Sequence, residues 1–125
     1  MIKVRVLQVD KDQENTDELA AGVAAGHTDN DGWQMPRESA PGDLVVWYAP
    51  GPHQFVARGW VEASPRKVEQ GFGPYRGPVA GMQWIEPTDR KKVIKDCGFD
   101  GGHQGYQTVK DEIAVDFLRS VRLLA

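Results

Sequence analysis

The stretch from Asp43 to Glu62 constrains the fold of this chain more than any other part of the sequence. It contains two runs typical of β-strands, DLVVWY and QFVARGWVE, and the connection APGPH between them is made of turn-forming residues. Alternate residues of the second run form two faces: Phe55, Ala57, Gly59 and Val61 on one, and Val56, Arg58 and Trp60 on the other. The first face is compact and apolar, so we predict a β-hairpin that lines the inside of a strongly curved sheet.

Other segments predict further strands and three helices. IKVRVLQV and VAGMQWI have strand patterns, whereas NTDELAAGVAAG predicts a helix that begins at Asn15 and stops at Gly26. TDRKKVIKDCG predicts a second helix capped by Thr88, and TVKDEIAVDFLRSVRLL a third capped by Thr108. The third helix carries one apolar stripe: Ile113, Phe117, Val121 and Leu124. We therefore predict a single α+β domain, residues 1–125, around a barrel-like sheet.

Composition excludes several classes of protein. No apolar run approaches the roughly 18 residues that span a bilayer, and the start of the chain lacks the features of a signal peptide. The lone cysteine, Cys97, excludes an internal disulfide, and we predict a cytoplasmic protein. A net charge of −3 argues against coating of nucleic acid through bulk positive charge. Four cations in the middle of the chain still allow a local basic surface: Arg58, Arg66, Lys67 and Arg76.

Catalytic and metal-binding motifs are not found. His27, His53 and His103 do not form a metal-ligand spacing with Cys97, and the sequence has no GxGxxG, Walker or GxSxG motif. The nearest candidate is a thiol–imidazole pair of Cys97 and His103, but a cysteine at a helix end is more often a small buried hydrophobe. We predict a protein without catalysis, metal or cofactor.

The aromatic residues are more informative. Phe55, Phe117 and Trp84 lie on apolar segments and are predicted in the core, whereas Trp60 is predicted to be half exposed. A second set lies in Gly-, Pro- and Asp-rich loops: Trp33, Phe72 and Tyr75. Rigid aromatic rings on loops are suited to stacking on a planar ligand. The alternative is that they fold back as lids over the ends of the barrel.

The linear pattern resembles the PUA-like superfamily, and within it the EVE and YTH domains that read modified bases. The resemblance rests on HTDNDGW, PGDLVVWYAPGPHQFVARGWVEASP, GFGPYRG and VAGMQWIEPTD, and it spans Ile2 to Leu118. An EVE domain has a tryptophan in its first strand, and MIKVRVLQV has none. The resemblance implies an incomplete, strongly curved β-barrel with flanking helices, which holds an extruded base between aromatic rings.

Carried over residue by residue, the resemblance implies a pocket on this chain. Its aromatic walls are Trp33, Phe72 and Tyr75, with Tyr48 (or Trp47) on the floor, and Trp84 is structural. We predict that the base edge is read by Asp29, Asn30 and Gln104, and that phosphates are bound by Arg58 and Arg76. Flipping a base costs a few kcal/mol of unstacking, which stacking in the pocket and edge hydrogen bonds must offset.

Three functions follow for this fold. The first is a non-catalytic reader of a modified base in DNA or RNA, acting with a nuclease or another effector in trans. The second is a nucleoside amidohydrolase like those of the ASCH relatives, although their GxKxxExR-type run is absent. The third is a module that binds a small molecule or a protein and no nucleic acid, an alternative that the acidic net charge leaves open.

Overall fold

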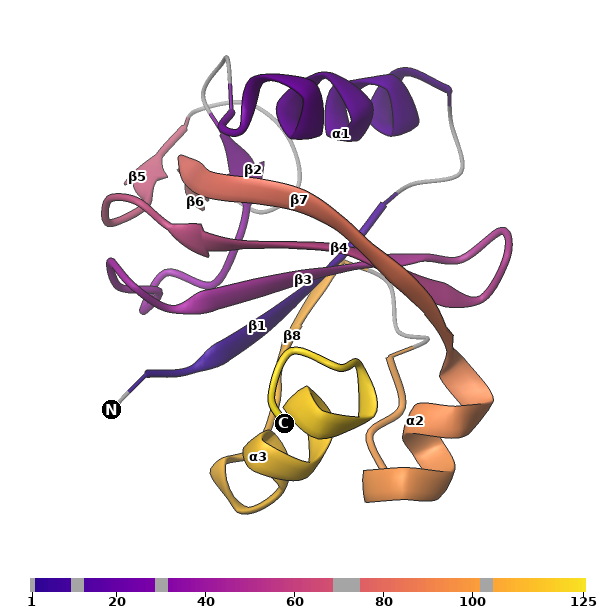
Figure 1. Cartoon of the computed structure of the whole chain (residues 1–125). Coiled ribbons are helices and arrows are strands. Elements are labelled where there is room, and N and C mark those ends of the chain that lie inside the picture. Colours follow the sequence, from indigo (N-terminus) through magenta and orange to yellow (C-terminus); the bar gives the residue numbers. More distant parts are fainter. Residues whose placement is uncertain (1, 10–12, 29–31, 69–74, 102–104) are drawn as a thin grey trace.

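The computed structural model describes residues 2–9, 13–28, 32–68, 75–101 and 105–125 (Figure 1). In chain order its elements are β1 (Val4–Gln8), α1 (Gln13–Ala25), β2 (Trp33–Gln34), β3 (Leu44–Ala49), β4 (Gln54–Val61), β5 (Arg66–Lys67), β6 (Tyr75–Gly77), β7 (Val79–Asp89), α2 (Arg90–Cys97), β8 (Tyr106–Thr108) and α3 (Asp111–Ser120). Five strands form the main sheet, in the order β7-β4-β3-β1-β8, and β2-β6-β5 form a small sheet. The predicted α+β class is confirmed.

The predicted hairpin is the pair β3–β4, which is antiparallel and lies inside the main sheet. Burial alternates along β4 as predicted, with Phe55, Ala57 and Val61 buried and Trp60 41% exposed. The register shifts between Phe55 and Ala57 in the pairing with β7. Such an irregularity redirects side chains, and Phe55 packs in a different core cluster from Ala57 and Val61. The prediction of one shared face was therefore wrong for Phe55.

The two faces of the main sheet carry two hydrophobic clusters. In Figure 1, α1 lies on one side of the sheet and α2 and α3 lie on the other. The first cluster packs around α1 and β2, and its buried members are Leu7, Val9, Leu19, Trp33, Met35, Val45, Trp47, Ala57, Val61, Val79 and Met82. The second packs under α2 and α3, and its buried members are Val4, Val6, Val46, Tyr48, Phe55, Val93, Phe99, Val109, Phe117 and Val121. Because both faces are covered, β3 is apolar throughout rather than alternating.

The stops of α1 and α2 were predicted correctly, but the helix starts and the end of α3 were not: α1 begins at Gln13 rather than at Asn15, and α3 ends at Ser120 rather than at Leu124. Gly26 and Gly98 have φ values of 85° and 79°, the left-handed conformation expected after a helix. In contrast, Thr88 and Thr108 lie in strands β7 and β8, because pairing with Phe55 and Arg5 extends these strands past the predicted caps. Within the described residues, no helix has the length and apolar composition needed to cross a bilayer.

The described residues of the segment after β4 form two short strands, β5 and β6. β6 pairs with β2 so that Trp33 lies opposite Gly77, and β5 pairs with β6. A Cβ atom at Gly77 would come within 2.9 Å of the Met35 sulfur, so a larger residue here would require Met35 to shift. Among the described residues the two sheets do not join into a closed barrel, in agreement with the predicted incomplete, curved arrangement.

A buried ion pair holds the beginning of the hairpin. Arg5 and Asp43 are 3% and 4% exposed, and Asp43 Oδ2 accepts hydrogen bonds from Arg5 Nε at 3.2 Å and Nη2 at 3.1 Å. The same oxygen accepts from the backbone N–H of Ala40 at 3.0 Å, and Arg5 Nη1 donates to the Thr108 hydroxyl at 2.7 Å. The pair therefore ties β1 to both β8 and the turn before β3.

Candidate functional site

The structure separates the predicted site residues. Four of them lie outside the described residues: Asp29, Asn30, Phe72 and Gln104. The others are divided among the two core clusters and the surface of the sheets.

Trp33 lies in the first core cluster. It was expected in a loop, but it forms β2 and is only 4% exposed. Its ring meets that of Trp47 edge to face, with centroids 5.6 Å apart. The alternation of Trp33, Gln34 and Met35, in which both apolar residues are buried, was a sequence signal for this short strand. Its predicted contact with a base remains a prediction.

Tyr48 lies on the opposite face of the sheet, in the second core cluster, and is 1% exposed. Its hydroxyl lies 3.2 Å from His53 Nδ1. Burial raises the pKa of the Tyr48 phenol, the guanidinium of Arg90 opposes this shift, and the carboxylate of Asp100 adds to it. Since Tyr48 and Trp33 belong to clusters on different faces, the structure does not bring them into one pocket.

Arg58 is held on the main sheet. Its Nη1 donates to the carbonyl oxygen of Gly81 at 2.9 Å, its Nη2 donates to Gln83, and its guanidinium carbon lies 5.8 Å from the centre of the Trp60 ring. Trp84, predicted in the core, is 53% exposed on the edge strand β7. That prediction was wrong because the whole apolar segment VAGMQWI was taken as buried. Only one face of β7 is covered, and Trp84 lies on the other.

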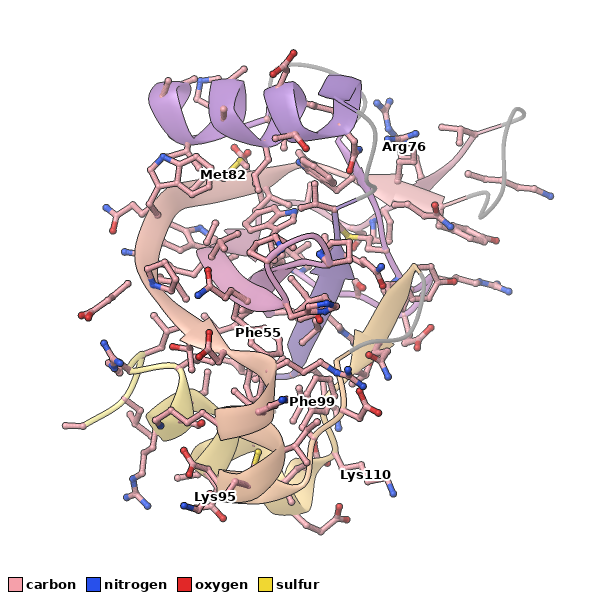
Figure 2. All side chains as sticks on the ribbon, turned by 90° about the vertical axis from the view of Figure 1, so that its right-hand side faces the viewer. Phe55, Arg76, Met82, Lys95, Phe99 and Lys110 are labelled. Atoms are coloured by element: carbon pink, nitrogen blue, oxygen red, sulfur yellow. The ribbon has the colours of Figure 1, made fainter. Side chains whose placement is uncertain are left out.

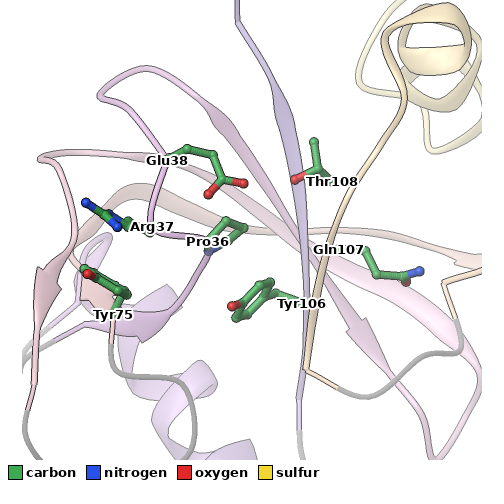
Figure 3. A pocket seen from close by; sticks show the side chains of 7 residues that line it. All are labelled: Pro36, Arg37, Glu38, Tyr75, Tyr106, Gln107 and Thr108. Atoms are coloured by element: carbon green, nitrogen blue, oxygen red, sulfur yellow. The ribbon is translucent and has the colours of Figure 1, made fainter.

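Tyr75, a predicted pocket residue, lines a cleft. The cleft has a volume of about 370 Å³ and lies between the segment after β2, strand β6 and strand β8 (Figure 3). Its lining residues are Pro36, Arg37, Glu38, Tyr75, Tyr106, Gln107 and Thr108. We call it the tyrosine cleft. Arg37 lies over the Tyr75 ring at 5.8 Å, a cation–π distance, and Tyr106 is 38% exposed.

Two of these lining residues, Arg37 and Tyr106, were missed by the sequence reasoning. Arg37 stands in a Pro-rich loop and carries no periodic signal. Tyr106 was in a Gly-rich connection, where a three-residue strand could not be distinguished from a loop. Its exposure follows from the position of β8 at the edge of the main sheet.

Four cations gather on and beside the small sheet: Arg37, Arg66, Lys67 and Arg76. Arg66 and Arg76 are directly opposite each other on β5 and β6. Like charges in that position repel. Arg76 Nε donates to the Gly32 carbonyl oxygen at 3.3 Å. In the part of the chain that the structure describes, none of the four forms an ion pair with a carboxylate. We call them the small-sheet cations.

The structure also shows what the remaining reactive groups do. The Cys97 thiol donates to the Val93 carbonyl oxygen at 3.3 Å, one turn earlier in α2. His103, its predicted partner in a catalytic pair, lies outside the described residues. A cleft of about 450 Å³ beside α2 is lined by Pro52, His53, Asp89, Arg90 and Lys91; we call it the His53 cleft. Among the described residues, no group of three or more His, Cys, Asp and Glu side chains could hold a metal ion.

Comparisons with known proteins find similarity in structure. No protein-family model matches the chain, and no curated protein sequence matches it significantly. The chain is similar to the crystal structure of Atu2648 from Agrobacterium tumefaciens, with a TM-score of 0.61 and 14% identity over 97% of this chain and 92% of that one.

Two further solved structures are similar over almost all of this chain. The YTH domain of Zygosaccharomyces rouxii MRB1, solved in complex with N6-methyladenosine RNA, has a TM-score of 0.60 and 9% identity, covering 99% of this chain and 89% of that one. A mutant of ZmASCH from Zymomonas mobilis has a TM-score of 0.56 and 14% identity, covering 98% of this chain and 99% of that one. The chain therefore has the PUA-like fold that YTH and ASCH domains share, as its sequence pattern predicted.

Proposed function

We propose that this chain is a non-catalytic nucleic-acid-binding module that receives a modified base in an aromatic pocket beside the small sheet. One observation carries the proposal: the tyrosine cleft adjoins four cations that have no acidic partner among the described residues. The chain has a net charge of −3, so this is a local concentration of positive charge on an acidic protein.

The tyrosine cleft has the size and the lining that a base requires. Its volume of about 370 Å³ lies in the range of small-molecule pockets. Tyr75 and Tyr106 offer rings for stacking, and stacking of one base on an aromatic ring contributes about 1–3 kcal/mol. Arg37 covers one face of the Tyr75 ring, and its planar guanidinium is itself a surface on which a base can stack. A methyl group on the base would add apolar area to the same contact.

The small-sheet cations supply contacts to phosphates. Guanidinium groups bind phosphate oxygens with paired hydrogen bonds. A phosphate near Arg66 and Arg76 would also relieve the repulsion between these two side chains, which are directly opposite each other. Arg58 is already bonded to Gly81 and Gln83, and its predicted phosphate contact would have to add to those bonds.

The fold neighbours indicate the first ligand to test. One of them is a YTH domain solved with N6-methyladenosine RNA, so methylated adenine is a suitable first probe. The predicted pocket residues outside the described part of the structure complete the proposed site as predictions: Asp29, Asn30, Phe72 and Gln104. We also propose that the module acts in the cytoplasm and delivers an effector, such as a nuclease, to its target.

Tyr75→Ala is expected to weaken binding of a short N6-methyladenosine RNA by roughly five- to 150-fold, because one stacking surface is lost. Fluorescence anisotropy with methylated and unmodified RNA and DNA measures the effect. Trp84→Ala is the matched control, because it removes an exposed aromatic side chain that does not line the tyrosine cleft. Equal losses from the two variants would show that the cleft is not the site.

Arg76→Ala is expected to weaken binding of all sequences to a similar extent and to reduce the slope of log affinity against log salt by about one. The control is Lys95→Ala, which removes the same charge from the exposed surface of α2, at the opposite end of the molecule in Figure 2. The comparison requires titrations at several salt concentrations. An unchanged slope for Arg76→Ala would contradict the assignment of the small sheet to phosphate.

A hydrolase is the second candidate, and the His53 cleft favours it. The buried hydroxyl of Tyr48 and the imidazole of His53 lie 3.2 Å apart, a geometry in which a proton can pass between them. Hydrolysis of an acylated nucleoside by the wild type, abolished in His53→Ala, would replace the reader proposal with an enzyme. Binding of modified RNA without any change of the ligand supports the reader.

A further inference from the structure

Strand β8 separates the tyrosine cleft from a second cleft. Tyr106 and Thr108 point toward the tyrosine cleft, whereas Gln107 points to the other side of the strand (Figure 3). On that side lies a cleft of about 440 Å³, which we call the Phe99 cleft. It is lined by Cys97, Gly98, Phe99, Asp100, Lys110 and Ile113, and it shares Gln107 and Thr108 with the tyrosine cleft. Figure 2 shows Phe99 and Lys110 at the same end of the molecule, beside α2 and α3.

Gln107, which lines the Phe99 cleft, has a side-chain oxygen without a partner among the described residues. Gln107 Oε1 is buried and accepts no hydrogen bond in the described part of the structure. If the amide group were turned over, its nitrogen would occupy the same unpartnered position. A buried amide atom without a partner is costly, so a ligand that supplies one would be favoured.

The charges around the cleft are compatible with an anionic ligand. Asp100, the acidic lining residue, is paired with Arg90 at 2.6 Å. Lys110 has no carboxylate partner among the described residues. Phe99 is 7% exposed and provides an aromatic wall. The cleft thus combines an apolar surface, a hydrogen-bonding amide and an available cation.

We propose that the Phe99 cleft holds the nucleotide next to the modified one, so that a dinucleotide crosses β8 with one base in each cleft. The inference rests on the proposed function. The edge of the second base bonds to the Gln107 amide, and its phosphate pairs with Lys110. Because β8 has three residues and lies at the edge of the main sheet, a nucleotide chain can cross it without meeting another strand of that sheet.

The test uses a five-nucleotide RNA with a central N6-methyladenosine and an abasic site on its 5′ or its 3′ side. One of the two abasic RNAs is expected to bind the wild type roughly fivefold or more weakly than the intact RNA, because a base contact is lost. That difference should disappear in the double variant Gln107→Leu/Lys110→Ala and persist in Lys95→Ala. Thermal melting verifies that both variants are folded.

The outcomes separate this inference from the proposed function. If the intact and abasic RNAs bind the wild type equally, or if the difference persists in the double variant, the proposed second site is wrong. The proposal that the chain binds a modified base is then unaffected. If no modified RNA binds, the reader is wrong. NMR titration with uridine 5′-monophosphate then addresses the cleft directly. Shifts of the Gln107 side-chain amide and the Ile113 methyl signals support the site, and unchanged signals overturn it.

Discussion

Trp33→Ala is expected to lower the free energy of unfolding by about 3–5 kcal/mol, the cost typical of deleting a large buried aromatic side chain. The indole is 4% exposed and packs edge to face on Trp47. Trp47 is fully buried, and its Nε1 has no hydrogen-bond partner among the described residues. A cavity at Trp33 would therefore open beside the ring of Trp47. Urea denaturation, with the slope as well as the midpoint determined, measures the loss.

Trp84→Ala is the control for this experiment. Its side chain is 53% exposed, so the expected loss is below about 1 kcal/mol. The burial of the two tryptophans is thus the reverse of what the sequence predicted. If Trp84→Ala were the more destabilising variant, the placement of both residues would be wrong. Binding measured on the same two proteins shows whether Trp33 also contacts a base.

Asp43→Ala is expected to destabilise the protein by about 3–5 kcal/mol, because it leaves the buried guanidinium of Arg5 without its buried carboxylate. The remaining carboxylate, that of Glu38, is 72% exposed and 3.8 Å away. Both residues are at least 96% buried, and the Asp43 carboxylate also accepts from the backbone N–H groups of Lys3 and Ala40. Replacing both partners, as in Arg5→Met/Asp43→Leu, should cost less than the single change, since no unpaired charge remains.

Asp111→Ala is the matched control for the ion pair. It breaks the Lys3–Asp111 bridge of 2.8 Å, whose side chains are 34% and 41% exposed. Exposed pairs of this kind contribute about 0–1 kcal/mol. Equal losses from Asp43→Ala and Asp111→Ala, measured by urea denaturation, would contradict the assignment of a structural role to the buried pair.

The parts of the fold that local chemistry determines could be predicted from the sequence. Strand β4 of the hairpin could be recognised because apolar residues occur at every second position, and burial follows that pattern. The helix stops at Gly26 and Gly98 could be recognised because a residue in the left-handed conformation is needed there. The starts of α2 and α3 could not be placed. Thr88 and Thr108 are good helix caps locally, but their pairing partners, Phe55 and Arg5, are distant in sequence.

The candidate site could be predicted only in part, because its residues come from segments that are distant in sequence. Tyr75 was identified from its loop composition, and it does line a cleft. Arg37 and Tyr106 also line that cleft. They belong to the segment after β2 and to β8, respectively, and no local sequence pattern indicates that these segments are neighbours. Burial of Trp33 likewise depends on the pairing of β2 with β6.

The position of β1 has a consequence for synthesis of the protein. β1 lies between β3 and β8, and Arg5 and Thr108, which are hydrogen-bonded across β1 and β8, are 103 residues apart. At a translation rate of about 5–20 residues per second, β8 is synthesised roughly 5–20 seconds after β1. During that time its apolar residues Val4, Val6 and Leu7 belong to an unfinished sheet with an open edge. The interval in which the nascent chain can aggregate or needs a chaperone is therefore set by the ribosome rather than by the rate of folding.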